Sequence, residues 1–268
     1  MARTEPPDLH DRLQFALALA QAAADVTMRY YRSKTLGVEI KSDRSPVTIA
    51  DREAEAVMTT QISRHWPNDG ILGEEQGEHK PQSPGRWILD PIDGTVSFAR
   101  AVPLFGTLIA YEHLGKCVLG VISMPALSEC VYAATGLGAW HTVANSKPVP
   151  ARVSNTDSLD RAIVCTTALE LFHAPNSPRL FDHLLTGGCR LRGWSDCYAH
   201  LLVATGRADA VIEPKIAPWD VAPMIPIMAE AGGKYTDWQG EATHLTPTGL
   251  SSNGTMHQTL INSLVPRA

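Results

Sequence analysis

The sequence predicts an α/β protein in which an α+β N-terminal half packs on an α/β C-terminal half. Two observations predict this class. Helix-like and then many strand-like segments fill the first half, whereas strand-like and helix-like segments alternate in the second. The proline-bounded segment Pro148–Pro150 separates the two patterns. We therefore expect one domain at residues 1–148 and another at residues 149–268, in a chain of 268 residues that is long enough to bury a full core.

The N-terminal half contains two predicted helices. Leu9–Tyr31 carries apolar residues at helical spacing, and Asp51–His65 forms a second helix in which Glu53 and Glu55 complement the dipole of the first turn. Residues 76–86 hold two prolines and two glycines, which indicates a surface loop. The expected strands are Val38–Lys41, Ile71–Glu75, Trp87–Leu89, Leu104–Tyr111, Lys116–Met124 and Cys130–Ala134.

The C-terminal half alternates short strands with helices that stop at glycines. Gly206 and the pair Gly232–Gly233 follow the last apolar residues of two helical patterns, as helix stops do. The expected strands are Ala162–Thr166, Arg190–Arg192 and Ala210–Glu213, and the expected helices are Pro178–Leu185, Asp196–Thr205 and Val221–Ala231.

Composition and charge exclude several classes of function. The net charge of −5 gives no electrostatic basis for binding nucleic acid or an anionic membrane. The five cysteines are scattered and show no zinc spacing, so we expect reduced thiols. The N-terminus lacks a signal-peptide pattern, and the apolar stretch Phe15–Ala24 is too short to span a bilayer. These features predict a soluble cytoplasmic protein.

The segment Trp87–Thr95 carries the main chemical signal. Its apolar residues predict a buried strand that ends at Asp90, and Pro91 lacks an N–H group, so we expect the chain to turn there. Asp93, Gly94 and Thr95 then open a helix or tight turn with free backbone N–H groups. Two carboxylates on such a turn can face one hard cation, and the N–H groups suit a phosphate oxygen. The alternative is a plain turn, because all these residues are turn formers.

Further acidic residues recur at strand ends and helix starts. Glu74 and Glu75 end one predicted strand, Asp51 begins a helix, and Asp220 precedes another. Acids at strand ends point into the crevice where open α/β sheets bind ligands, and a cation would relieve their repulsion. A set of carboxylates without Cys or His suits Mg²⁺ or Mn²⁺. The alternatives are that Asp51 and Asp220 are helix caps and that the glutamates are solvated loop charge.

Four segments together resemble the inositol monophosphatase family. They are Lys41–Asp51, Gly73–Glu75, Asp90–Thr95 and Trp219–Ala222, and the similarity runs from about Leu9 to Leu260. The resemblance implies a layered αβαβα sandwich of the inositol monophosphatase and fructose-1,6-bisphosphatase type. It also implies a Mg²⁺-dependent phosphomonoesterase with two to three ions per site, Mn²⁺ being an alternative, and a homodimer.

The same resemblance implies ligands for the metal ions. By matching position, Glu74, Asp90 and the Ile92 carbonyl resemble the ligands of one ion, and Glu74 also resembles a ligand of a weaker third ion. Asp90, Asp93 and Asp220 resemble the ligands of a second ion. Metal ions of this kind neutralise phosphate oxygens and activate water, so hydrolysis requires no covalent enzyme intermediate.

Catalytic and substrate-binding residues follow by the same matching. Asp51 and Thr95 match the pair that orients the nucleophilic water, and Glu74 is the third predicted catalytic residue. The Gly94 and Thr95 N–H groups would hold the phosphate. The full set of predicted substrate-binding residues is Asp93, Gly94, Thr95, Asp196, Glu213 and Asp220.

The substrate is predicted from the second half of the chain. The segment Ser195–Tyr198 and the following residues are similar to the histidinol-phosphatase branch of the family. Asp196 and Glu213 would complement the ammonium and imidazole of L-histidinol phosphate by charge-assisted hydrogen bonds, whereas inositol carries only hydroxyls. Asp196 could instead only cap its helix. Trp194–Ser195 stands where that branch often has two glycines, which would reshape the pocket.

We therefore predict hydrolysis of a small phosphate monoester, L-histidinol phosphate, in histidine biosynthesis. The alternatives are an inositol-1-phosphate or broad sugar-phosphate phosphatase and, from another class, a non-catalytic regulator that binds a metal or phosphoester. The presence of both Asp51 and Thr95 argues against a regulator, because binding alone requires no water activator.

Overall fold

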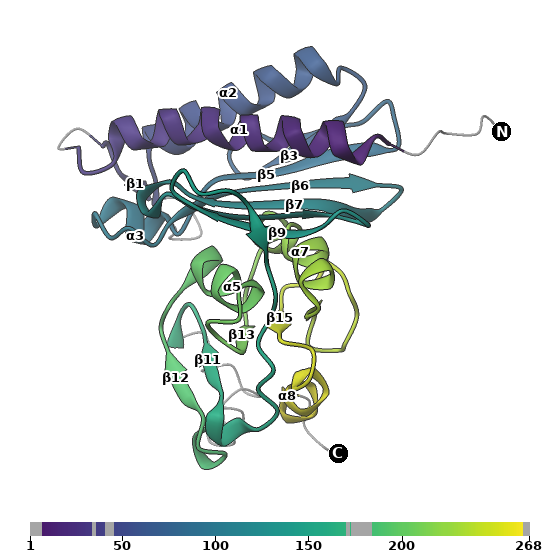
Figure 1. Cartoon of the computed structure of the whole chain (residues 1–268). Coiled ribbons are helices and arrows are strands. Elements are labelled where there is room, and N and C mark those ends of the chain that lie inside the picture. Colours follow the sequence, from purple (N-terminus) through teal and green to yellow (C-terminus); the bar gives the residue numbers. More distant parts are fainter. Residues whose placement is uncertain (1–6, 34–35, 41–45, 170–171, 173–183, 265–268) are drawn as a thin grey trace.

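The computed structural model describes residues 7–33, 36–40, 46–169, 172 and 184–264. Its elements stack as alternating layers of helix, sheet, helix, sheet and helix (Figure 1). This arrangement confirms the predicted αβαβα sandwich. The expected helix Pro178–Leu185 falls almost entirely outside the described residues. No helix among the described residues is long and apolar enough to cross a membrane.

The outer helix layer consists of α1 (Leu9–Tyr30) and α2 (Ile49–His65), which pack on one face of the first sheet (Figure 1). Asp8 caps α1 by accepting from the N–H groups of His10 and Asp11. Thr48 caps α2, so this helix begins slightly earlier than predicted. The small sheet of β1 (Glu39–Ile40) and β2 (Pro46–Val47) precedes it.

The first sheet has the strand order β10-β9-β8-β7-β6-β5-β3-β4 and is antiparallel except for the pair β3 and β5. Its strands are β3 (Gly70–Gly73), β4 (Gly77–His79), β5 (Gly85–Asp93), β6 (Gly106–His113), β7 (Lys116–Met124), β8 (Glu129–Ala134), β9 (Gly138–Val143) and β10 (Val149–Pro150). Strand β10 is an edge strand of this sheet, so the pairing of the first sheet extends to Pro150. The domain division between residues 148 and 149 stays a prediction.

Two expectations for this sheet were wrong. The predicted loop 76–86 contains β4, which pairs with β3 and forms an edge hairpin. The strand at Trp87 does not end at Asp90 but continues to Asp93. Pro91 is tolerated because the pairing with β6 shifts its register between Asp90 and Asp93, so no regular ladder bond from Pro91 is needed.

The second sheet has the order β12-β11-β13-β15-β14, with β11 parallel to β12 and β13. Its strands are β11 (Ile163–Cys165), β12 (Arg190–Arg192), β13 (Ala210–Glu213), β14 (Lys234–Thr236) and β15 (Gly249–Ser252). The last two strands were not predicted. They pair antiparallel with each other, and β15 also pairs with β13.

Helices α5 (Asp196–Ala204), α6 (Pro218–Val221) and α7 (Met224–Ala231) belong to the middle layer, and α8 (His257–Leu264) covers the far face of the second sheet (Figure 1). The predicted helix Val221–Ala231 is split, because Pro223 cannot donate a helical hydrogen bond and α7 begins after it. The middle core joins apolar residues of both sheets with α5 and α7. This packing brings the ends of β5 and α6 together.

Candidate active site

Three carboxylates converge where β5 ends and α6 begins. The ligand oxygens of Asp90, Asp93 and Asp220 all lie within 4.8 Å of one another. The register shift at the end of β5 directs Asp90 and Asp93, and Asp90 Oδ1 accepts from the Ile92 N–H group at 2.9 Å. Asp220 lies in the first turn of α6, where its Oδ2 accepts from the Ala217 N–H group at 2.8 Å. The structure therefore brings together three residues predicted to share one ion.

The electrostatics of this cluster fit a hard divalent cation. Burial and then the nearby Glu74 carboxylate raise the pKa of Asp90 well above its usual value, and Asp93 and Asp220 add to the shift. Burial and then Asp196 raise the pKa of Asp93 in the same way. All these donors are oxygens, which Mg²⁺ and Mn²⁺ prefer. A bound cation would remove the repulsion that raises these pKa values.

Glu74 is carried by a turn that follows β3. Its N–H group donates to the Leu89 carbonyl at 3.2 Å, which extends the parallel pairing of β3 and β5 by one residue. The buried Glu55 of α2 holds this turn, because its carboxylate accepts from the N–H groups of Glu75 at 2.9 Å and Gln76 at 2.7 Å. Because α2 begins at Ile49, its first-turn acid is Asp51, and the expectation that Glu53 and Glu55 lie in that turn was wrong. The position of Glu55, four residues after Asp51 and on the same helix face, was the available signal.

Asp51 and Thr95 each have a local hydrogen bond. Asp51 forms a capping box with Thr48, accepting from its N–H group at 2.8 Å and its hydroxyl at 2.5 Å, so it also stabilises the helix start. Burial, with Glu75 and Glu74 nearby, raises the pKa of Asp51 to about 6. The Thr95 hydroxyl donates to the Ile92 carbonyl at 3.0 Å. The role of Asp51 and Thr95 in orienting a water stays a prediction.

Gly94 forms the N-cap of the short helix α3 (Thr95–Ala99). Its φ of +81° lies in the left-handed region that glycine tolerates best. A Cβ atom here would lie 2.8 Å from the Leu104 carbonyl oxygen and 3.2 Å from Asp196 Oδ2. The backbone can therefore take this conformation beside the carboxylates only because residue 94 has no side chain.

The N-terminus of α5 meets the carboxylate cluster. The Cys197 N–H group donates to Asp93 Oδ2 at 2.5 Å, and the Asp196 N–H group donates to Thr167 Oγ1 at 2.9 Å. Thr167 in turn donates to Glu213 Oε1 from its hydroxyl at 2.8 Å and its N–H group at 3.1 Å. This chain of contacts places Asp196 and Glu213, which are 17 residues apart in number, at one site.

A cavity of about 100 Å³ opens between these groups. Burial raises the pKa of Glu213, on its wall, to about 8 and lowers that of His200 to about 3. Trp194, which we expected to reshape the pocket, packs against the middle core instead and is not among the lining residues. The lining residues are Asp93, Thr167, Asp196, Cys197, His200, Glu213, Lys215, Ile216 and Asp220.

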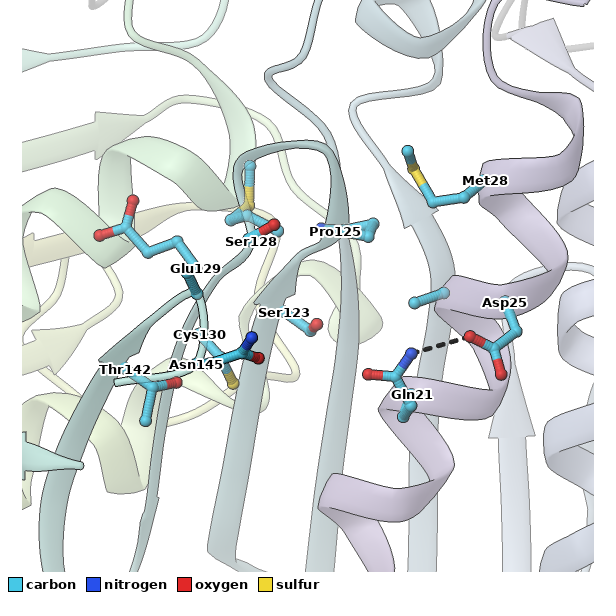
Figure 2. A pocket seen from close by; sticks show the side chains of 13 residues that line it. Gln21, Asp25, Met28, Ser123, Pro125, Ser128, Glu129, Cys130, Thr142 and Asn145 are labelled. Atoms are coloured by element: carbon cyan, nitrogen blue, oxygen red, sulfur yellow. Dashed lines mark hydrogen bonds between the residues drawn. The ribbon is translucent and has the colours of Figure 1, made fainter. Parts of the chain in front are cut away.

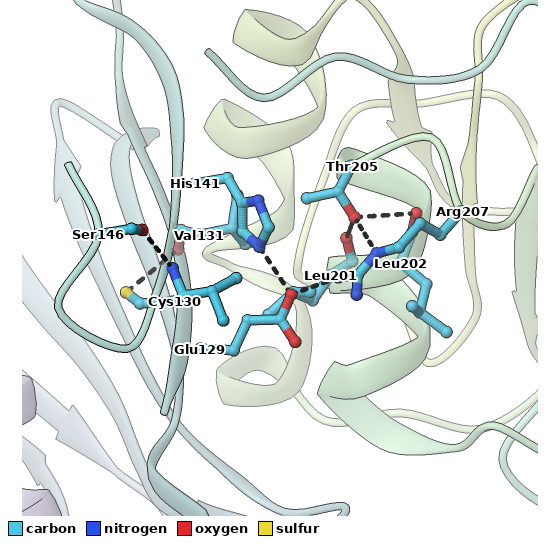
Figure 3. A network of polar contacts seen from close by, with 10 residues as sticks. Glu129, Cys130, Val131, His141, Ser146, Leu201, Leu202, Thr205 and Arg207 are labelled. Atoms are coloured by element: carbon cyan, nitrogen blue, oxygen red, sulfur yellow. Dashed lines mark hydrogen bonds and ion pairs between the residues drawn. The ribbon is translucent and has the colours of Figure 1, made fainter. Parts of the chain in front are cut away.

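The other end of α5 is anchored to the first sheet by an ion-pair network (Figure 3). Arg207 Nη2 contacts Glu129 Oε1 at 2.5 Å, and His141 Nε2 contacts the same oxygen at 2.6 Å.

Ser195, not Asp196, is the N-cap of α5, and Asp196 begins the helix with a φ of +55°. The backbone position of Asp196 therefore does not support the alternative that this residue only caps its helix.

A second hollow, of about 400 Å³, lies between α1 and the strands β7 to β9 (Figure 2). Its polar lining includes Gln21, Asp25, Ser123 and Asn145, and Gln21 donates to Asp25 at 2.8 Å. None of the predicted site residues lines it. The larger hollow is thus separate from the cluster of Asp90, Asp93 and Asp220.

Almost the whole chain matches one known family, because the profile described as "Inositol monophosphatase family" covers residues 8–268. The chain belongs to the inositol monophosphatase family. Members are metal-dependent phosphatases, and this protein is a phosphoric monoester hydrolase that acts on small phosphate monoesters. The family confirms the resemblance inferred from the four sequence segments.

Individual relatives are similar over nearly their full lengths. A histidinol-phosphatase of Chlorobaculum parvum is 42% identical over 253 residues, covering 94% of this chain and 96% of that protein. A fructose-1,6-bisphosphatase/inositol-1-monophosphatase of Thermotoga maritima is 33% identical, covering 94% of each. The solved structure of a Thermotoga maritima IMPase superposes with a TM-score of 0.83 at 31% identity, covering 95% of this chain and 96% of that one.

Proposed function

We propose that this phosphatase hydrolyses L-histidinol phosphate to L-histidinol and phosphate, as a step of histidine biosynthesis. The observation that carries the proposal is the acidic wall of the cavity, formed by Asp93, Asp196, Glu213 and Asp220. A histidinol-phosphatase is also more similar in sequence, at 42% identity, than the relative named for fructose bisphosphate and inositol phosphate, at 33%.

Four acidic side chains and one lysine, Lys215, line the cavity, and this excess of acids favours a cationic alcohol. Asp93 and Asp220 belong to the proposed metal site, so Asp196 and Glu213 are the acids left to meet the organic part of the substrate. An ammonium or imidazolium group there would form a charge-assisted hydrogen bond with Asp196. It would also lower the pKa of Glu213, which burial raises to about 8, and so relieve the repulsion among the buried acids. An inositol hydroxyl could accept or donate a hydrogen bond but would leave that repulsion in place.

Mg²⁺ is the proposed cofactor, with two to three ions held by Glu74, Asp90, the Ile92 carbonyl, Asp93 and Asp220. When bound, such ions neutralise phosphate oxygens, lower the pKa of water and stabilise the leaving alkoxide.

The chain's own groups position the reaction. The N–H groups of Gly94 and Thr95, at the start of α3, hold the phosphate. The Asp51 carboxylate and the Thr95 hydroxyl orient the attacking water, the hydroxyl turning away from the Ile92 carbonyl to do so. Phosphoryl transfer of this kind depends on alignment and charge, so a side-chain nucleophile is not needed.

The test is phosphate release with Mg²⁺ from L-histidinol phosphate and from inositol-1-phosphate, compared at matched concentrations. We expect a strong preference for histidinol phosphate that shrinks in Asp196→Asn. The exposed Asp160→Asn is the matched control and should keep the wild-type preference. Equal or reversed preference in the wild type would contradict the histidinol assignment and favour an inositol or broad sugar-phosphate phosphatase.

A second test separates catalysis from mere binding. Thr95→Ala should bind phosphate as the wild type does and lose most turnover, because only the water-orienting hydroxyl is removed. Unchanged turnover in this variant would contradict the proposed role of Thr95.

We also propose that the protein is a homodimer. Analytical ultracentrifugation that finds only the 29.0 kDa chain would exclude the dimer.

A further inference from the structure

A second group of metal-ligating side chains lies outside the carboxylate site. Glu112 is the last residue but one of β6, Cys117 is the second residue of β7, and His244 belongs to the connection between β14 and β15. One ligand atom from each residue lies within 4.8 Å of the others. His244 is separated from Cys117 by 127 residues, so only the packing of the second half on the first sheet brings the three together.

The β6–β7 hairpin presents two of these side chains as a pair. Glu112 and Cys117 are direct cross-strand partners, and the register of the two strands shifts between Tyr111 and Glu112. Side chains of directly opposed residues lie on the same face of a sheet, so both point toward the third residue. His244 covers them and is only 4% exposed, and Cys117 is 8% exposed.

The contact between thiol and imidazole is a hydrogen bond in this structure, and its length also fits two ligands of one metal ion. Cys117 Sγ lies 3.5 Å from His244 Nδ1. A tetrahedral Zn²⁺ ion, about 2.3 Å from sulfur and about 2.0 Å from nitrogen, would hold these two atoms roughly 3.5 Å apart. His244 Nε2 lies 3.1 Å from Glu112 Oε2, and the contact with His244 is the main cause that lowers the pKa of the Glu112 carboxyl. The two nitrogens of the buried imidazole therefore face the other two candidate ligands, Nδ1 the thiol and Nε2 the carboxylate.

The charges also balance. A divalent ion bound by the Cys117 thiolate and the Glu112 carboxylate, with a neutral His244, forms a buried group with no net charge. Arg86 Nη2 contacts Glu112 Oε2 at 3.1 Å, so the carboxylate would be shared between the ion and the guanidinium. The positive charge of that guanidinium is met by Glu78, whose Oε1 lies 3.2 Å from Arg86 Nη1. Sulfur and nitrogen ligands select Zn²⁺ or Co²⁺ over Mg²⁺, which distinguishes this group from the all-oxygen site.

We propose that Cys117, His244 and Glu112 bind one borderline divalent transition-metal ion of the Zn²⁺ type. The ion fastens the β14–β15 connection of the second half onto the β6–β7 hairpin of the first. Binding displaces the thiol proton of Cys117 and leaves a fourth position for water. The proposal does not depend on which phosphate ester the enzyme hydrolyses.

Co²⁺ titration of the full-length protein, with Mg²⁺ in excess, tests this site. A cysteine thiolate bound to Co²⁺ gives an intense near-ultraviolet charge-transfer band, which an all-oxygen site cannot give. We expect the band to saturate at one ion per chain, to disappear when Zn²⁺ is added, and to be absent in Cys117→Ser. His244→Ala should weaken Co²⁺ binding at least tenfold.

Cys189→Ser is the matched control, because Cys189 is also a buried free thiol but lies in the second sheet region, and it should keep the band. The metal-free variants are first compared with the wild type by circular dichroism, and Cys117→Ala replaces Cys117→Ser if the latter does not fold. Absence of the band in the wild type, or its persistence without Cys117, would overturn the proposal.

Discussion

Replacing Glu55 tests whether a side chain outside the metal site positions Glu74. The Glu55 carboxylate lies against Gly73 and accepts from the N–H groups of Glu75 and Gln76, at 2.9 and 2.7 Å. Glu55→Ala leaves both N–H groups without this acceptor. Glu55→Gln keeps one acceptor oxygen and turns an N–H₂ group toward the other donor. Glu55→Ala therefore removes both hydrogen bonds to the turn, whereas Glu55→Gln removes one of them.

The expected magnitude follows from these two bonds. A hydrogen bond to a charged acceptor contributes about 1.5–3 kcal/mol, and the half-buried turn lets water replace part of it. We expect Glu55→Ala to lower the free energy of unfolding by about 2–4 kcal/mol, and Glu55→Gln by about half as much. If roughly 1.4 kcal/mol of this loss falls on the placement of Glu74, the Mg²⁺ concentration for half-maximal activity rises about tenfold.

Two assays separate positioning from general stability. Urea unfolding gives the free energy, and phosphate release measured against Mg²⁺ concentration gives the activation constant. Glu53→Gln is the control, because Glu53 lies on the same helix but interacts with Tyr30. A loss of stability with an unchanged Mg²⁺ dependence would show that Glu55 is merely structural. Wild-type values in both assays would refute the reasoning altogether.

Three other predictions concern single sites. Gly94→Ala places a side chain at a left-handed φ of +81° and 2.8 Å from the Leu104 carbonyl oxygen. Urea unfolding should therefore show a free energy of unfolding lower by about 2 kcal/mol or more, together with slower phosphate release. Wild-type values in both measurements would contradict this. Arg207→Met leaves the buried Glu129 without its guanidinium and should cost about 1–2 kcal/mol in thermal unfolding, which Arg207→Lys should partly restore. Burial lowers the pKa of His257 to about 4, below its unfolded value near 6.5, so the stability it supports is complete above pH 6.5 and is lost as the pH falls toward 4. Urea unfolding gives the free energy of unfolding at each pH between 4 and 6.5. Its rise with pH should be smaller in His257→Gln than in the wild type by about 1.4 kcal/mol per pH unit, and equal slopes would contradict the assignment.

The local patterns of the sequence were sufficient for the regular elements. Apolar spacing predicted a helix at Leu9–Tyr31, and the structure has α1 at Leu9–Tyr30. The strands at Lys116–Met124 and Ala210–Glu213 have the predicted bounds, because short segments rich in apolar residues specify buried strands. Local rules failed at Pro91, where a register shift against β6 lets the strand continue, and this depends on a partner strand that the local sequence does not identify.

The sequence by itself determined which carboxylates to examine, since the four family-like segments contain Asp90, Asp93 and Asp220. Only the tertiary structure decided that their oxygens lie within 4.8 Å of one another. It also decided that Glu55 supports the Glu74 turn and that His244 meets Cys117. The physical reason is that hydrogen-bond periodicity and turn chemistry act over a few residues, whereas the burial and repulsion that shape these sites come from groups brought together by the packing of two sheets.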